Sequence, residues 1–395
     1  MYHQQEHGDA PKPVAQSDGV GVSVNLGHHD ARQSQRCSEC ILPAEYPGIE
    51  YDESGQCNYC RRWKRKWDSL DFAKQAAQLE GILGAYRGKL YPYDCLIGLS
   101  GGKDSVYAAY ILKKHNMRPL ACTFDNGFLT ETALHNISST VNALGIGHVV
   151  VHAPPGDLHR LYRHCVLTAG EFCSVYNVGI RSALYRMAKC YGIKLVVTGQ
   201  SNRTEASSPK EYFTCSSGYF QNVGGTVASK KELAGFMYMS QFKRALWHLR
   251  RTVVYLQLPS YVPWKEEEFK EELARNVDWR GSVGEQHADC RMSDAKEYLK
   301  LKHFGVTELT AKLSSLVRDR QLSREDALVR IQQQVDHLQE NEASIREQIR
   351  KEFDLSESQL DEAIRASHIP YISKADTFLS NLKNLQEVLR YRKQK

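Results

Sequence analysis

Short apolar runs alternate with amphipathic segments along the middle of the chain. Four runs rich in branched residues predict strands over residues 95–99, 120–124, 148–151 and 195–198. The segments between them have helical spacing, and residues 177–191 predict the clearest helix because their apolar positions fall on one face. This alternation predicts an α/β fold with a doubly wound parallel sheet, in which a ligand binds at the C-terminal ends of the strands.

The pattern changes on both sides of this region. Residues 1–36 are polar and predict a disordered tail, and residues 71–90 predict a connecting helix. After Phe269 the strand patterns fade and helical periodicity takes over. Ser323 with Asp326, and Ser356 with Gln359, have the spacing of helix N-caps.

The turn after the first predicted strand has the composition of a phosphate-binding loop. Its six residues are Ser100, Gly101, Gly102, Lys103, Asp104 and Ser105. The glycines let the backbone approach an anion, the serines add hydroxyl donors, the lysine adds positive charge, and the N–H groups of the next helix point at the ligand. Asp104 is interpreted as a magnesium ligand or a helix cap. The spacing differs from the Walker loop and resembles the SGGxDS PP-loop of N-type ATP pyrophosphatases, which form AMP and pyrophosphate and adenylate a carbonyl oxygen.

Two other strand ends are expected beside this loop. After the second strand, the backbone of Phe124 is interpreted as reading an adenine edge, and Asp125 as facing the metal or the ribose. The alternative for Asp125 is a turn residue ahead of an Asn-Gly pair. After the fourth strand, Gly199 permits a close approach and Gln200 is a candidate for orienting a reacting oxygen.

Two CxxC pairs near the start of the chain indicate a zinc ribbon. Their cysteines are Cys37, Cys40, Cys57 and Cys60. Four thiolates leave no open coordination position, so this zinc site is predicted to be structural rather than catalytic. The residues between the pairs predict a hairpin that turns at residues 53–55. A reduced, metal-free pair of knuckles and an iron–sulfur cluster are the alternatives.

Composition sets outer limits on these interpretations. At 395 residues with 42% hydrophobic residues, the chain has room for two or three domains with a sizeable core. No apolar run approaches the ~20 residues of a membrane span, and the first 36 residues do not resemble a signal peptide, so we expect a cytoplasmic protein. Its 11 cysteines are then expected as ligands, catalytic thiols or, for Cys95, Cys165 and Cys190, core residues. The net charge of +6 is too mild to indicate nucleic-acid binding by itself.

Four stretches together resemble the N-acetyl sugar amidotransferase family of lipopolysaccharide and other surface-polysaccharide biosynthesis. The resemblance is tight over residues 37–130 and again around 313–331. It rests on an N-terminal CxxC, PGIEYDESGQCNYC, YDCLIGLSGGKDS and LSREDAL. The resemblance implies that ATP and Mg²⁺ bind residues 100–105, and that structural Zn²⁺ binds the four cysteines. It further implies that the enzyme adenylates the acetamido oxygen of a nucleotide-linked sugar, after which ammonia displaces AMP and leaves an acetamidino group.

The same resemblance implies partner subunits. Ammonia in that family comes from subunits similar to the glutaminase and cyclase of histidine synthesis, and no glutaminase domain is evident in this sequence.

The motifs and patterns divide the chain into a tail (1–36), a zinc-ribbon module (37–68), a PP-loop ATP-binding domain (69–265) and a helical C-terminal region (266–395).

A sulfurtransferase is the first alternative. The segment around Cys173 resembles a region of tRNA 2-thiolating PP-loop enzymes that carries CxxC before a helix, although Tyr176 stands at the second position here. A thiol at a helix N-terminus is expected to have a lowered pKa and to carry a persulfide, with Cys122, Cys215 or Cys290 as its partner. Sulfur would then convert the same adenylated carbonyl into a thiocarbonyl. The simpler interpretation makes Cys173 and Cys290 buried packing residues.

A nucleic-acid-binding module is the second alternative. Residues 61–67 hold five basic residues and two tryptophans, and a further basic stretch runs from Lys243 to Arg251 around Trp247. Such runs grip a phosphate backbone and stack on bases. The competing interpretation is a solvated helix face with its aromatic rings packed inward, and for the second stretch a docking patch for a partner.

Overall fold

The computed structural model describes residues 35–373, apart from residues 154, 202, 206–208, 238–245, 247–249, 251 and 282–288. The predicted tail over residues 1–36 and the basic stretch around Trp247 therefore lie almost entirely outside the described residues. Among the residues that are described, none of the helices combines the length and the apolar character that crossing a bilayer requires.

A five-stranded parallel sheet forms the centre of the fold. The strands are β1 (Cys95–Gly98), β2 (Pro119–Asp125), β3 (Gly147–His152), β4 (Leu195–Thr198) and β5 (Val254–Gln257). Their order is β3-β2-β1-β4-β5, and every neighbouring pair is parallel. The doubly wound α/β fold is thus confirmed. The order reverses at β1, and in such sheets the crevice at this reversal binds the ligand.

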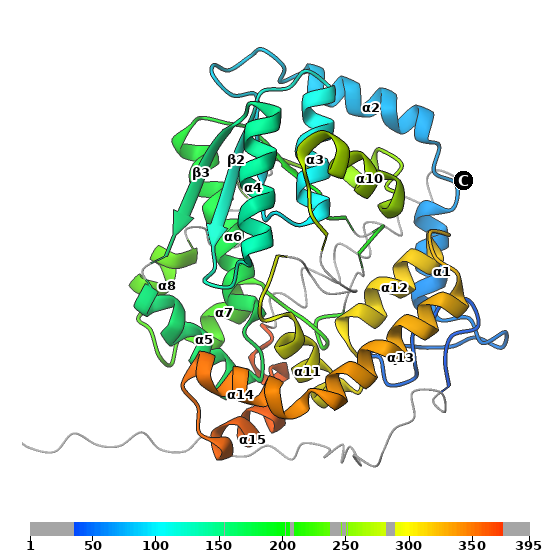
Figure 1. Cartoon of the computed structure of the whole chain (residues 1–395), viewed down its shortest axis with the longest axis vertical. Helices are drawn as coiled ribbons and strands as arrows, with labels where there is room; N and C mark the ends of the chain where they lie inside the picture. Colours follow the sequence, from blue (N-terminus) through cyan, green and yellow to red (C-terminus); the bar gives the residue numbers. More distant parts are fainter. Residues whose placement is uncertain are drawn as a thin grey trace, which may run out of the picture. The chain divides into compact units, whose positions relative to one another are not determined.

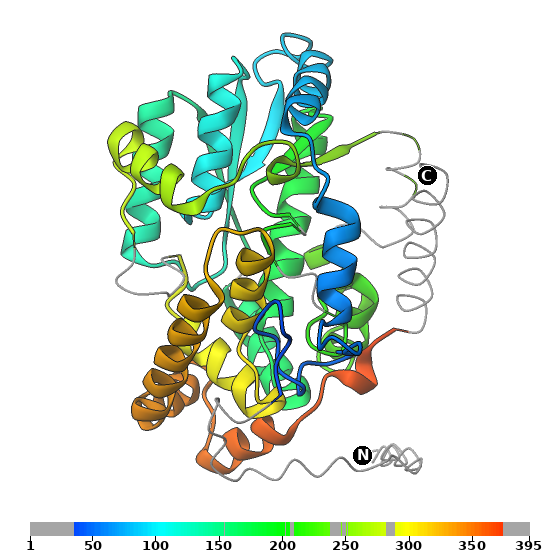
Figure 2. The ribbon, with the colours of Figure 1, turned by 90° about the vertical axis from the view of Figure 1, so that its right-hand side faces the viewer.

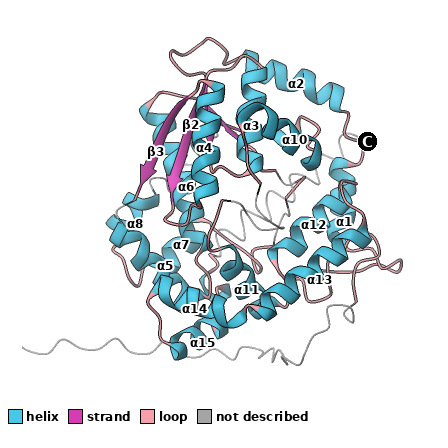
Figure 3. Cartoon of the chain, viewed as in Figure 1, coloured by secondary structure: helices cyan, strands magenta, loops and turns pink. Residues whose placement is uncertain are grey.

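Alternate strand residues point into two separate cores, one on each face of the sheet. On one face, residues such as Ile97 and Val197 pack with α2 (Phe72–Gly84), α3 (Lys103–Lys114), α4 (Glu131–Leu144) and α10 (Glu266–Val277). On the other face, residues such as Leu96 pack with α5 (Pro155–Ala169) and α6 (Cys173–Cys190). Helices enclose the sheet on both sides (Figure 3).

The C-terminal helices are α11 (Ser293–Phe304), α12 (Glu308–Arg318), α13 (Arg324–Glu340), α14 (Glu342–Phe353) and α15 (Glu357–Arg365). Helices α11, α14 and α15 share the second of these cores, whereas α12 and most of α13 form a cluster of their own around Leu313 and Ile331. Phe353 of α14 packs on Phe172 and Tyr162, with ring centroids 5.2 and 6.2 Å apart. Strands β2 and β3 point toward these helices, which gather beyond the C-terminal ends of the strands (Figure 1). The chain therefore places its last helices at the end of the sheet where the loop lies.

The remaining regular elements are short. They are α1 (Asn58–Trp67), α7 (Ser217–Gly224), α8 (Lys230–Met237) and the 3₁₀ turns Leu258–Ser260 and Ile369–Tyr371. In the N-terminal segment, isolated antiparallel bridges join Arg36 to Pro43 and Tyr51 to Cys57, so the predicted hairpin is present without regular strands. This segment lies beside the C-terminal helices (Figure 2), which it contacts through Arg318 and Arg324.

Both helix N-caps predicted from the sequence are present in the structure. The side chain of Ser323 accepts a hydrogen bond from the Asp326 N–H, and Ser356 forms a reciprocal capping box with Gln359. Such a cap stabilises a helix by about 1 kcal/mol. The helix predicted over residues 71–90 is shorter, because α2 begins after its cap Asp71 and ends at Gly84.

Candidate functional site: a phosphate loop and a four-cysteine cluster

The SGGKDS loop lies at the C-terminal end of β1, where the strand order reverses. Gly101 has φ +81°, and a Cβ there would lie 2.4 Å from the Ala133 carbonyl oxygen, so only glycine fits. The Gly101 carbonyl oxygen accepts hydrogen bonds from Asn136 Nδ2 at 3.0 Å and Trp279 Nε1 at 3.1 Å. Neighbouring elements therefore hold the loop in one conformation before any ligand binds.

Serine hydroxyls close the loop from within. The Ser100 N–H donates to Ser105 Oγ at 3.1 Å, and Ser105 Oγ donates to the Gly102 carbonyl at 2.9 Å. Helix α3 begins directly after Gly102, so its first N–H groups face the concave side of the loop. This arrangement suits an oxyanion such as a phosphate.

Lys103 and Asp104 form a charged network beside the loop. Lys103 Nζ donates to Asp104 Oδ2 at 2.6 Å and to Glu266 Oε1 at 3.0 Å, and Trp264 Nε1 donates to Asp104 Oδ1 at 2.8 Å. Burial opposes the charge of Lys103, but the two carboxylates raise its pKa. Burial likewise opposes ionisation of Asp104, but Lys103, Lys312 and the two hydrogen bonds lower its pKa. Both groups are therefore charged at neutral pH.

The other two strand ends differ from each other. Gly199 is buried, and a Cβ there would lie 2.1 Å from the Asp104 carbonyl oxygen, so glycine lets the end of β4 pack against the start of α3. The side chain of Gln200 is exposed. Asp125 Oδ1 accepts from the Gly127 N–H at 3.0 Å and Oδ2 lies 3.1 Å from His152 Nδ1, so its carboxylate has the contacts of a turn residue. Phe124 is 9% exposed and packs closely on Gly179.

The four predicted cysteine ligands converge. All are fully buried, and their sulfur atoms lie within 4.8 Å of one another. Cys37 Sγ lies 3.7 Å from Cys60 Sγ, and Cys40 Sγ lies 3.8 Å from Cys57 Sγ. Zn–S bonds of ~2.3 Å in a tetrahedron place sulfurs roughly 3.8 Å apart. The donor set and its spacing thus fit a tetrahedral zinc ion.

Comparison with known proteins finds similarity to a protein family in one part of the chain. Residues 282–386, called the WbpG-like region below, match the C-terminal domain of WbpG-like LPS biosynthesis proteins. This match confirms, for the C-terminal region, the resemblance to polysaccharide-biosynthesis proteins that the sequence indicates. An uncharacterized protein of Methanocaldococcus jannaschii is 26% identical over 166 residues, which are 42% of this chain and 58% of that protein. The chain thus matches little more than half the length of this relative.

Two synthetases are among the solved structures that align with this chain. The NMN synthetase of Francisella tularensis aligns with a TM-score of 0.36 and 17% identity over 68% of this chain and 94% of that one. The NH3-dependent NAD synthetase of Campylobacter jejuni aligns with a TM-score of 0.25 and 12% identity over 55% of this chain and 100% of that one.

The WbpG-like region contributes a residue to the loop that the sequence did not reveal. Asp289 Oδ2 accepts from Ser100 Oγ at 2.8 Å and lies 2.8 Å from where a Gly102 Cβ would stand. A negative oxygen therefore occupies the concave side of the loop. Nothing near Asp289 in the sequence marks it as a loop partner, because 189 residues separate it from Ser100.

A second unpredicted carboxyl, Glu205, lies in the loop that follows β4. Burial, followed by the negative charge of Asp104, raises the pKa of Glu205 to about 8, against the opposing charges of Lys312 and Lys103. Helix α12 of the WbpG-like region supplies Lys312. Glu205 can therefore exchange a proton near neutral pH, which suits a general acid or base.

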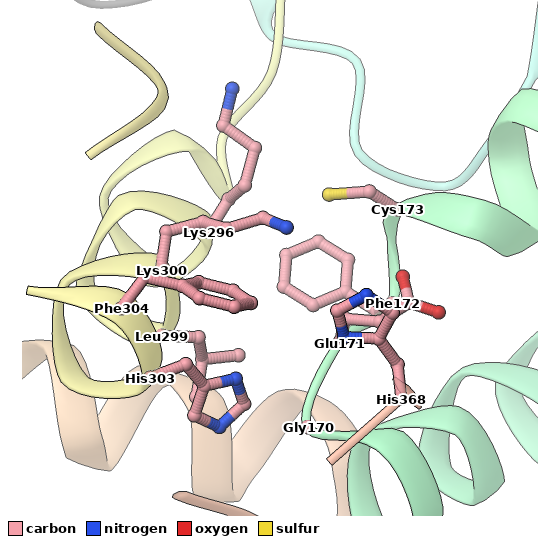
Figure 4. A pocket seen from close by; sticks show the side chains of 10 residues that line it. All are labelled: Gly170, Glu171, Phe172, Cys173, Lys296, Leu299, Lys300, His303, Phe304 and His368. Carbon is pink, nitrogen blue, oxygen red and sulfur yellow. The ribbon is translucent and has the colours of Figure 1, made fainter. Parts of the chain in front are cut away.

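Cys173 overturns one expectation. It is the first residue of α6 and lines a pocket opposite Lys296 and Lys300 of the WbpG-like region (Figure 4). Burial raises its pKa, with Glu308 adding to that effect and Lys296 opposing it, so the predicted lowering by the helix N-terminus is wrong. The helix field is weak beside the cost of removing a thiolate from water. Burial also raises the pKa values of Cys290 and Cys122.

Two further predictions concern surface residues. Cys190, expected in the core, is exposed at the end of α6. In the basic stretch of α1, Arg61 pairs with Asp52 at 2.9 Å and Lys64 pairs with Glu39, while Trp63 Nε1 donates to a backbone carbonyl at 3.3 Å. These cations have acidic partners within the chain, as the solvated-face interpretation implies.

Proposed function

We propose that the chain uses ATP to adenylate a carbonyl oxygen and then replaces that oxygen with nitrogen, converting an acetamido group on a nucleotide-linked sugar into an acetamidino group. The observation that carries the proposal is the SGGKDS loop, which ends strand β1 and begins helix α3 at the reversal point of the sheet. The match of residues 282–386 to an LPS biosynthesis domain supports a surface-polysaccharide acceptor.

Activation is the first chemical step. An amide carbon is a poor electrophile, so the amide oxygen attacks the α-phosphorus of ATP and pyrophosphate leaves. Lys103 and the N–H groups at the start of α3 would stabilise the charge that develops between the α- and β-phosphates. Asp104 and Asp289 offer carboxylate oxygens to Mg²⁺, which would screen the phosphates when bound.

Nitrogen replaces the activated oxygen in the second step. Ammonia attacks the carbon of the adenylated amide, the C–O bond breaks, and the amide oxygen leaves on AMP. The attacking nitrogen sheds protons as the amidine forms, and Glu205, a carboxyl near Asp104 and Lys103, is the candidate proton acceptor. Under the same proposal, subunits similar to the glutaminase and cyclase of histidine synthesis would supply the ammonia in the cytoplasm.

The test is product formation by the full chain. The full chain is incubated with candidate nucleotide-linked acetamido sugars, MgATP and either ammonium or sulfide. The masses of the products are measured by mass spectrometry. Replacing oxygen by NH lowers the acceptor mass by about one unit, whereas sulfur raises it by about 16 units. We expect the nitrogen product together with AMP and pyrophosphate. A chain that releases no pyrophosphate with any acceptor would contradict the proposal.

Cys173 separates nitrogen transfer from sulfur transfer. Ammonia reaches the adenylate without a covalent bond to the enzyme, whereas a persulfide needs a reactive thiol. Because burial disfavours the Cys173 thiolate, Cys173→Ser is expected to keep most of the ammonia-dependent turnover. Pyrophosphate release and product formation are measured together. If a folded Cys173→Ser protein still adenylates the acceptor but forms no product, sulfur transfer becomes the better proposal.

A further inference from the structure

The WbpG-like region reaches the four-cysteine cluster directly. Arg318, the last residue of α12, donates through Nε to Cys60 Sγ and through Nη2 to Cys40 Sγ, each at 3.3 Å. Four thiolates around Zn²⁺ carry a net charge of −2, so the guanidinium fork offsets part of the charge of the site. Arg324 also donates to the backbone carbonyls of Cys40 and Cys37, at 3.2 and 3.3 Å. Helices α12 and α13 therefore contact the cluster through these two arginines.

The residues that follow Arg318 reach the phosphate loop. Gln321 Oε1 accepts a hydrogen bond from the Glu266 N–H at 3.2 Å, and Gln321 Nε2 donates to Asp319 Oδ2 at 2.7 Å. Glu266 is the first residue of α10, and its carboxylate accepts from Lys103 Nζ at 3.0 Å. The side chains of Lys103 and Glu266 are only 14% and 12% exposed, so this contact has little competition from water.

A continuous set of contacts therefore runs from the cysteine sulfurs to the loop lysine. Residue 318 is fixed by the cluster, residue 321 is fixed by the start of α10, and only two residues separate them. Between them, Asp319 Oδ2 lies 3.9 Å from Nε of the buried Arg203 side chain. The backbone carbonyl of Arg203 in turn accepts a hydrogen bond from Trp63 Nε1 of α1. A displacement of the cluster would shift this segment, and with it Glu266.

We propose that residues 318–321 couple the zinc cluster to the phosphate loop, so that zinc sets the position of Lys103 as well as the fold of the N-terminal segment. Arg318 and Gln321 are positioning residues in this scheme, and neither touches the substrate. The inference rests on the proposed use of ATP by the SGGKDS loop. Through this segment, the zinc bound by the four cysteines would affect the binding of ATP at the loop.

Three single variants of the full chain test the coupling. Arg318→Met removes the guanidinium from the sulfurs, Gln321→Met removes the bond to Glu266, and Arg320→Met is the matched control. Arg320 lies in the same segment, but its side chain is 85% exposed and pairs with Asp68. Zinc release is followed with a colorimetric chelator, and binding of α,β-methylene-ATP with Mg²⁺ is followed by calorimetry.

The expected results differ for each variant. Arg318→Met should release zinc about tenfold faster or more, as outer contacts of metal sites do when lost, and should bind the analogue more weakly. Gln321→Met should release zinc at the wild-type rate yet bind the analogue about fivefold more weakly, the value of one hydrogen bond. Arg320→Met should match wild type in both measurements.

Two outcomes would overturn the coupling. One is an Arg318→Met protein that loses zinc quickly but binds the analogue as wild type does. The other is a Gln321→Met protein with unchanged analogue affinity. A wild-type chain that does not bind the analogue at all would instead refute the proposed function, so the two failures are distinguishable.

Discussion

Replacing Lys103 with methionine is expected to reduce pyrophosphate formation about a hundred- to a thousandfold, the typical loss when one preorganised donor to a transition-state charge is removed. Lys103 stands at the start of α3, charged and nearly enclosed between Asp104 and Glu266. Its ammonium would move onto the phosphates of bound ATP, where methionine of similar length offers no charge. Pyrophosphate release under saturating MgATP measures the effect.

The same helix supplies a matched control. Lys114 is the last residue of α3 and pairs with Glu272 of α10, as Lys103 pairs with Glu266. It is half exposed and lies at the end of the helix opposite the loop. Lys114→Met should therefore leave pyrophosphate release within about twofold of wild type, since exposed ion pairs contribute 1 kcal/mol or less. Circular dichroism checks that both variants fold. Equal rates in Lys103→Met and Lys114→Met would remove the loop from the mechanism.

Loss of one cysteine ligand is expected to have the largest effect on stability. Binding of Zn²⁺ by a structural site contributes on the order of 10 kcal/mol at neutral pH, far above the ~1 kcal/mol of an ordinary substitution. Cys57→Ser should therefore abolish stoichiometric zinc and lower the unfolding temperature sharply. Elemental analysis and thermal unfolding measure the two effects. Because thiolates must be deprotonated to bind the metal, zinc should also leave as the pH falls.

The exposed Cys190 provides the control for this change. It lies at the end of α6, remote in sequence from the cluster, so Cys190→Ser should keep the metal and the wild-type unfolding temperature. Protein purified without chelators should contain one zinc ion per chain. A zinc-free wild type of full stability would contradict the zinc site, and the metal-free interpretation of the four cysteines would replace it.

Local features of the sequence predicted the fold well. Strands β1 to β4 were found within a residue or two of their ends, because branched apolar runs of four to seven residues have few other uses. Strand β5 was not predicted. Tyr255 is exposed, and Val254 and Gln257 are only partly buried, so Val254–Gln257 lacks the continuous burial of the central strands. The division of the chain into four segments stays a prediction.

The candidate site was predictable only in part, for a physical reason. The SGGKDS loop and the CxxC pairs each hold their chemistry within a few consecutive residues. Asp289 and Glu266 contact the loop from more than a hundred residues away, and Gln321 contacts Glu266, so only the packing of α10 and the WbpG-like region reveals them. The burial of Cys173 agrees with its simpler interpretation as a packing residue. The lowered pKa of the sulfur-transfer alternative was wrong, because it used only the helix position, whereas burial depends on the rest of the fold.

The aromatic contacts between Phe353, Phe172 and Tyr162 affect the expression of fragments of the protein. Helices α11, α14 and α15 share one apolar core with α5 and α6, and each of these three side chains is at most 3% exposed. A fragment that stops before the WbpG-like region would present this surface to water and invite aggregation. Expression and crystallisation should therefore start from the undivided chain, and the unfolding of both halves should follow a single cooperative transition.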